Sequence, residues 1–153
     1  SSDLIFINAF AKDKKRCWPL ERVAELVLAL KQHGSWQDVS FIINIVPEAM
    51  SSAQKYFDKQ SLNNTILVSA QHNFFQLPAI MAECDLIISV ETAVMHLANA
   101  VRVPVVALMR QKNPEWAPID TANSTIITTP NRVDWVKTIT VADVMKTLET
   151  ITI

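Results

Sequence analysis

The chain has 153 residues, half of them hydrophobic, and its fourteen Lys and Arg against fifteen Asp and Glu leave a formal net charge of −1. This length is that of one globular domain, and the lack of a basic excess argues against binding to nucleic acid or to an anionic membrane surface. Gly34 is the only glycine. A Gly-x-Gly-x-x-Gly dinucleotide turn and a Walker phosphate loop both need several glycines, so both motifs are excluded.

Segments typical of strands and of helices alternate along the whole chain. Short apolar runs predict strands, and apolar residues at spacings of three and four predict helices between them. Pro19 suits the first turn of the first helix and Gly34 its end, while Asn73 and Thr140 are suited to cap later helices. In chain order we predict strand 4–10, helix 19–34, strand 39–46, weak helix 47–59, strand 65–68, helix 74–84, strand 85–90, helix 92–101, strand 103–109, a long loop, strand 124–129 and helix 141–151.

Continuous runs of Val, Ile and Leu, such as 41–46 and 86–90, predict strands that are covered on both faces. Since these strands alternate with helices, the fold class predicted is α/β, a Rossmann-like, doubly wound and mostly parallel sheet of five or six strands. Nothing divides residues 1–153, so we expect a single domain.

Cys17 and Cys84 lie far apart and form no Cys-x-x-Cys pair, which favours a reducing cytosol over a secreted scaffold. No run approaches the ~18 consecutive apolar residues that span a bilayer, and the first residues lack the basic start of a signal peptide. We therefore expect a cytoplasmic protein without a transmembrane segment.

The loop and helix over 89–100 carry the most informative polar residues. In doubly wound sheets the ligand crevice lies outside the carboxyl ends of the strands. Here a strand delivers Glu91 and Thr92 to a helix N-terminus, whose free amides and dipole favour an anion, and His96 lies one turn further on. The pattern indicates a diphosphate site. Spacing alone fits equally well a Thr92 that only caps the helix and a His96 that packs in the core.

The segment Ser89 to Ala100, with the strand Val103 to Leu108 after it, resembles the signature of the heptosyltransferase family, commonly Ser-x-Asp-Thr-Gly-x-x-His-Leu-Ala-x-Ala. The segment Lys15 to Arg22 is similar to the family's Lys-x-Trp-Pro-x-Glu-Arg stretch, and Asn113 to Pro118 resembles the loop after the fifth strand. Together the resemblance spans residues 4–120 or so.

This resemblance implies the C-terminal, donor-binding domain of a two-domain GT-B glycosyltransferase that is inverting and needs no metal or other cofactor. The resemblance implies ADP-heptose as the donor and the lipopolysaccharide inner core as the acceptor. A missing N-terminal domain would help to hold this acceptor, and the full-length enzyme would lie at the periphery of the inner membrane. Carried over by motif, Arg16 would meet the diphosphate, Glu91 the hydroxyls of the donor sugar, Thr92 and the Ala93 amide the phosphates, and His96 the sugar-phosphate region; Glu48, Gln71 and His72 match segments that border the nucleoside.

Two positions depart from the family signature. Glu91 stands where the family usually has Asp, and Ala93 stands where it usually has Gly. The longer acid shifts its carboxylate, and the methyl group narrows the approach to phosphate. Ala93 is tolerable if it is helical, because its amide survives.

Other interpretations remain open for several residues. Glu48 is more readily explained as a charge in the first turn of a helix than as a ribose ligand. Lys12 and Lys14 are typical of a solvated loop. His33 is typical of a solvated helix end. The three histidines belong to separate elements, so we expect no metal. A receiver-type signalling domain fits poorly because the required clustered acids and phosphorylatable Asp are missing. A non-catalytic nucleotide or nucleotide-sugar binding module is the main alternative, because the general base would come from an N-terminal domain.

Overall fold

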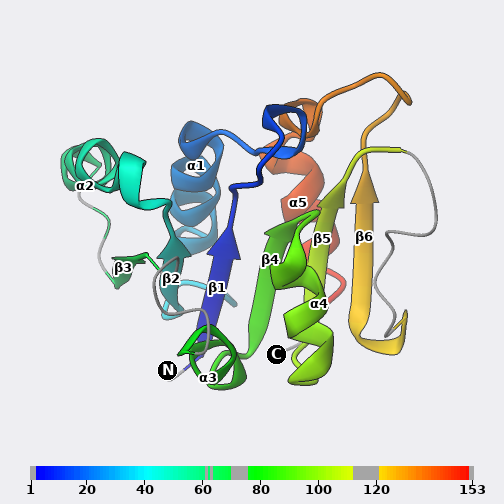
Figure 1. Cartoon of the computed structure of the whole chain (residues 1–153). Helices are drawn as coiled ribbons and strands as arrows, with labels where there is room; N and C mark the ends of the chain where they lie inside the picture. Colours follow the sequence, from blue (N-terminus) through cyan, green and yellow to red (C-terminus); the bar gives the residue numbers. More distant parts are fainter. Residues whose placement is uncertain (1–2, 61, 63, 70–75, 112–120, 152–153) are drawn as a thin grey trace.

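The computed structural model describes residues 3–60, 62, 64–69, 76–111 and 121–151. Within them six strands form one all-parallel sheet in the order β3-β2-β1-β4-β5-β6 (Figure 1). The strands are β1 Leu4–Asn8, β2 Ser40–Asn44, β3 Thr65–Val68, β4 Leu86–Val90, β5 Val105–Met109 and β6 Ser124–Thr128. The predicted α/β, Rossmann-like doubly wound fold is thereby confirmed.

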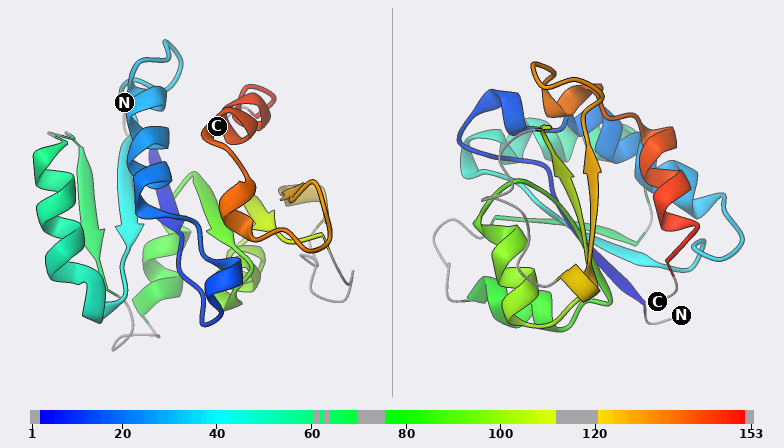
Figure 2. Two further views of the ribbon diagram at one scale, coloured as in Figure 1. Left: turned by 90° about the horizontal axis from the view of Figure 1, so that it is seen from above. Right: turned by 90° about the vertical axis from the view of Figure 1, so that its right-hand side faces the viewer.

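Helices cover both faces of this sheet, as the two views of Figure 2 show, with α1, α2 and α5 on one face and α3 and α4 on the other. The helices are α1 Leu20–Lys31, α2 Met50–Lys59, α3 Gln76–Ala82, α4 Ala93–Ala100 and α5 Val141–Leu148, and the short 3-10 helices are η1 Lys14–Arg16, η2 Pro47–Ala49, η4 Thr121–Asn123 and η5 Val136–Thr138. Because successive strand residues point to opposite faces, Ile5 and Ile7 pack in one apolar layer and Phe6 in the other.

The predicted ends of the first helix are only partly right. Pro19 precedes α1 as its N-cap rather than lying in its first turn. Gly34 does not end the helix, so that prediction is wrong: α1 ends at Lys31, and the Gln32 amide bonds to the carbonyls of Leu28 and Ala29. Gly34 adopts no positive φ, and a Cβ there would meet no atom within 4 Å.

The cap expected from Asn73 lies outside the described residues. The cap expected from Thr140 is confirmed. Its side chain accepts from the Asp143 amide at 3.1 Å, and the Asp143 carboxylate accepts from the Thr140 amide at 3.0 Å, which together form a capping box.

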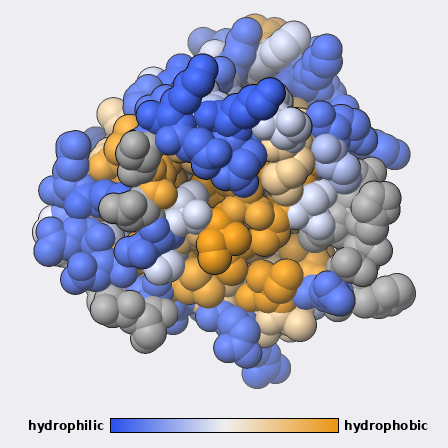
Figure 3. All heavy atoms as spheres, turned by 90° about the vertical axis from the view of Figure 1, so that its left-hand side faces the viewer, coloured by the Kyte–Doolittle hydropathy of each residue, from blue (hydrophilic) through white to orange (hydrophobic). Residues whose placement is uncertain are grey.

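Figure 3 views the side where β3 forms the edge of the sheet, and apolar side chains gather near the centre of that face. Ile66 of β3 is 62% exposed.

At the end of the sheet where β1 begins, Asp3, Trp36 and Glu149 line a cavity of about 260 Å³ together with His33. His33 is therefore half-buried rather than solvated. None of the described helices is long and apolar enough to cross a membrane.

Candidate donor-binding site

The sheet changes direction of winding between β1 and β4, and the polar ends of its strands meet there. β1 pairs with β2 on one side and with β4 on the other, so that Asn8 lies opposite both Asn44 and Ser89. In a doubly wound sheet this switch point opens a crevice outside the carboxyl ends of the strands. The candidate site therefore lies where β4 leads into α4.

The N-terminus of α4 forms the floor of this crevice. Thr92 is the N-cap in an extended conformation, and its Oγ1 accepts a hydrogen bond from the Val94 amide at 3.1 Å. Ala93 is the first residue of the helix and has no positive φ, which confirms that alanine is tolerated at this position without backbone strain. The Val94 and Met95 amides are bonded to Thr92, so the Ala93 amide and the helix dipole are what this N-terminus offers to an anionic ligand.

Arg16 reaches the crevice from the other side. It closes η1, which Asp13 caps by accepting from the Lys15 amide at 2.9 Å. That hydrogen bond lowers the pKa of the Asp13 carboxyl, helped by the nearby charges of Lys15, Arg16 and Arg110. The turn is anchored just beyond by Trp18, which is buried.

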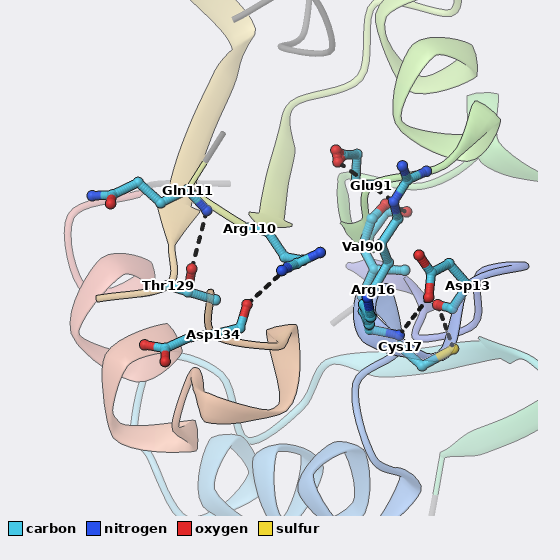
Figure 4. Close-up of polar contacts among 11 residues, drawn as sticks. Asp13, Arg16, Cys17, Val90, Glu91, Arg110, Gln111, Thr129 and Asp134 are labelled. Atoms are coloured by element: carbon cyan, nitrogen blue, oxygen red, sulfur yellow. Dashed lines mark hydrogen bonds and ion pairs between the residues drawn. The ribbon is translucent and has the colours of Figure 1, made fainter. Parts of the chain in front are cut away.

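Glu91 follows β4 directly and faces Arg16. Their closest atoms, Nε of Arg16 and Oε2 of Glu91, lie 4.0 Å apart, and the side chains are 30% and 3% exposed. Figure 4 shows the two side chains next to each other. Arg110, which follows β5, does not join them, because its Nε donates to the Asp134 carbonyl oxygen at 2.8 Å. Glu91 thus offers a nearly buried carboxylate that Arg16 helps to balance, while the more exposed guanidinium can still meet an anion.

A cavity of about 250 Å³ brings together all five residues expected to meet the diphosphate and the sugar. Its lining consists of Arg16, Glu91, Thr92, Ala93 and His96. These residues come from η1, from the end of β4 and from the first turns of α4. The lining holds one guanidinium, one carboxylate, one hydroxyl and one imidazole, which can bind charged and hydroxylated groups at the same time.

A second cavity of about 420 Å³ shares Thr92 and Ala93 with the first. Its lining is mainly apolar side chains and asparagines from the ends of β1 and β2, with two charged groups: Asn8, Phe10, Lys12, Asn44, Ile45, Val46, Glu48, Leu77, Thr92, Ala93 and Val94. Glu48 lies in the first turn of η2 and also lines this cavity, while its contact with a nucleoside stays a prediction. Gln71 and His72 lie outside the described residues.

Several residues of the second cavity carry no motif that marks them in the sequence. Lys12, expected to be only solvated, is exposed but also lines the cavity. Asn8 and Asn44 were not expected to take part at all. The available signal was positional, because Asn8, Asn44 and Ser89 each stand near the end of an apolar run. Among the described residues, no group of three His, Cys, Asp or Glu side chains could hold a metal ion.

Two adjacent cavities, one mainly apolar and one charged, thus lie beside a helix N-terminus at the switch point of a parallel sheet, where doubly wound α/β domains form their ligand sites. The family model of glycosyltransferase family 9, the heptosyltransferases, matches residues 2–140. The chain therefore belongs to this family. No curated protein sequence matches the chain.

Solved structures of the family share the fold. Heptosyltransferase II of E. coli superimposes with a TM-score of 0.77 at 18% identity, over 97% of this chain and 46% of that one. E. coli WaaC, solved with ADP-2-deoxy-2-fluoro heptose, gives 0.78 at 14% identity, over 97% and 43% of the two chains. A family 9 glycosyltransferase from Veillonella parvula gives 0.78 at 20% identity, over 98% and 46%. The chain thus spans less than half the length of each of these proteins.

Proposed function

We propose that the chain is the donor-binding domain of an inverting glycosyltransferase that transfers heptose from ADP-heptose to the lipopolysaccharide inner core. The observation that carries this proposal is the pair of adjacent cavities that share Thr92 and Ala93 in their linings. The mainly apolar cavity suits a nucleoside, and the charged cavity suits a diphosphate and a sugar. The family match and the ADP-sugar in the structure of E. coli WaaC support ADP-heptose as the donor.

Each residue has a distinct role in this proposal. Arg16 and the Ala93 amide bind the diphosphate, because a guanidinium fork and a helix N-terminus are both suited to phosphate oxygens. Glu91 fixes the position of Arg16 and offers its carboxylate to the sugar hydroxyls. His96, one turn along α4, borders the sugar-phosphate region.

Catalysis needs more than these residues supply. An acceptor has to be activated by a base and aligned with the anomeric carbon. The described carboxylates that line the two cavities are Glu91 and Glu48, and both are assigned to the donor. We therefore propose that the base and the acceptor site belong to an N-terminal domain, and that the full-length enzyme works at the cytoplasmic face of the inner membrane without a metal.

Titration calorimetry with ADP, UDP and ADP-heptose tests donor binding by this chain. We expect weak binding, with ADP preferred over UDP, because only one wall of the cleft is present. The 153-residue chain should form no product from ADP-heptose and a lipid A core acceptor, while the same domain joined to its N-terminal half should do so. Binding of ADP-heptose without transfer by that longer protein would favour the non-catalytic binding module.

A further inference from the structure

Asn8 stands at the centre of a polar network that links three strands to the start of α4. It is the last residue of β1 and is 3% exposed. Its Oδ1 accepts from Asn44 Nδ2 at 3.2 Å. Its Nδ2 lies 3.3 Å from Ser89 Oγ, 3.2 Å from Thr92 Oγ1 and 3.3 Å from the carbonyl oxygen of Phe10. One side chain thus touches β2, β4 and the cap of α4.

The Phe10 carbonyl fixes which way the Asn8 carboxamide faces. A carbonyl oxygen can only accept a hydrogen bond, so the Asn8 atom beside it has to be the NH₂ group. The same NH₂ group faces Ser89 and Thr92, so its two protons serve three acceptors and at least one of these hydrogen bonds is bifurcated. Ser89 Oγ already donates its proton to the Val90 carbonyl at 2.8 Å, and it therefore accepts from Asn8.

The consequence for Thr92 follows from counting its hydrogen-bonding capacity. A threonine hydroxyl has two lone pairs and one proton. Thr92 Oγ1 accepts from the Val94 amide at 3.1 Å and faces the Asn8 NH₂ group at 3.2 Å, so a donor stands at each of its lone pairs. Neither neighbour can accept a proton from it. The hydroxyl proton is therefore left to point away from both, and Thr92 lines both cavities of the site.

We propose that Asn8 is a positioning residue that directs the Thr92 hydroxyl proton into the cleft, toward an anionic oxygen of the bound donor. This role rests on the proposed donor site. Without Asn8, the Thr92 hydroxyl has a free lone pair on the side that Asn8 occupied, and its proton can turn to that side. The proton is then no longer held toward the negatively charged oxygen of the donor. Hydrogen bonds to charged groups are about twice as strong as neutral ones, so the direction of this proton matters for affinity.

A double-mutant cycle tests the coupling between Asn8 and Thr92, with ADP affinity measured by NMR titration, which reaches millimolar Kd values. Asn8→Leu should raise the Kd for ADP about fivefold or more in the wild-type background. In the Thr92→Val background the same change should raise it less than about twofold, because the hydroxyl is already gone. Thr92→Ser keeps a hydroxyl and should retain the full sensitivity to Asn8→Leu.

Asn99→Ala is the matched control. It removes another amide-to-hydroxyl hydrogen bond, from Asn99 Nδ2 to Ser124 Oγ at 3.1 Å, on a side chain that lines neither cavity of the site. This variant should bind ADP as the wild type does. If Asn8→Leu does not fold, as judged by thermal melting, Asn8→Ser replaces it in the cycle, since serine is too short to span to Thr92.

The possible outcomes separate this role from the proposed function. Equal effects of Asn8→Leu in the wild-type and Thr92→Val backgrounds would mean that Asn8 acts through the fold or by direct contact with the donor from the second cavity, not through Thr92, and the positioning role would be refuted. Wild-type binding of ADP that is insensitive to Asn8 would refute that role alone. A wild-type chain that binds no nucleoside diphosphate would refute the donor site and the positioning role together.

Discussion

Replacing Arg16 by alanine is the most direct perturbation of the charged cavity. The Arg16 side chain is 30% exposed and lines the cavity, so it can reach an anion without leaving its place beside Glu91. A hydrogen bond to a charged group contributes roughly 1.5 to 3 kcal/mol. Since about 1.4 kcal/mol corresponds to a tenfold change, the Kd for ADP should rise about ten- to a hundredfold. Arg16→Lys keeps the charge but loses the fork, and it should fall between wild type and Arg16→Ala.

Titration calorimetry measures this effect, and Lys15→Ala is the matched control. Lys15 carries the same charge one residue earlier in η1, but it is exposed and lines neither cavity of the site. Its loss should change the Kd for ADP less than about twofold in 0.15 M salt, because exposed charges are screened. A side effect on the fold has to be checked, since Arg16→Ala leaves a nearly buried carboxylate at Glu91. The double variant Arg16→Ala/Glu91→Gln removes that carboxylate charge and should recover part of any lost thermal stability. Equal ADP binding by wild type and Arg16→Ala would remove Arg16 from the site.

Other parts of the chain give three further predictions. Iodoacetamide at pH 8 should label Cys17 well before Cys84, because burial raises the pKa of the Cys84 thiol to about 11; equal labelling rates in peptide mass spectrometry would contradict this. Asp143→Ala should lower the free energy of unfolding by about 1 kcal/mol in denaturant titrations at pH 7. The hydrogen bond from the Thr140 amide lowers the pKa of Asp143, so this stability difference should be present above about pH 4 and vanish as the pH falls further. Ala93→Val, which adds methyl groups at a position lining both cavities, should weaken ADP binding about tenfold in calorimetry without unfolding α4, and unchanged affinity would refute that position's contact with the donor.

The pattern of apolar residues predicts the fold best where burial is uniform. β4 and β5 are buried at all five positions each, so their unbroken apolar runs could predict strands covered on both faces. The prediction fails at Gly34, because composition alone cannot show what the chain does after a helix. The segment after α1 turns back through hydrogen bonds from the His33 amide to Leu30 and from the Trp36 amide to His33, and it buries Trp36. The end of the helix is set by that packing rather than by glycine.

The site was predictable as a set of residues but not as a network. The motif residues Arg16, Glu91 and Thr92 lie in two segments whose order along the chain fits the fold, so they could be assigned to one crevice. Asn8 could not, because an asparagine at the end of a strand is common at turns and carries no sign of its partners. Its importance arises from the register that sets it beside both Asn44 and Ser89, which only the pairing of three strands reveals.

The central place of β1 has a consequence for how the chain folds. β1 is the first strand of the chain, but one of its two neighbours is β4, and Asp85, just before β4, holds the Leu4 amide at 2.8 Å across 81 positions of sequence. During synthesis the strand is therefore left with one open edge until residues 86–90 emerge. Strands that lie so far apart in sequence pair slowly, and an open strand edge can pair with other chains in the meantime. Fragments that stop before β4 should consequently aggregate, whereas fragments that reach past β4 have closed both edges of β1.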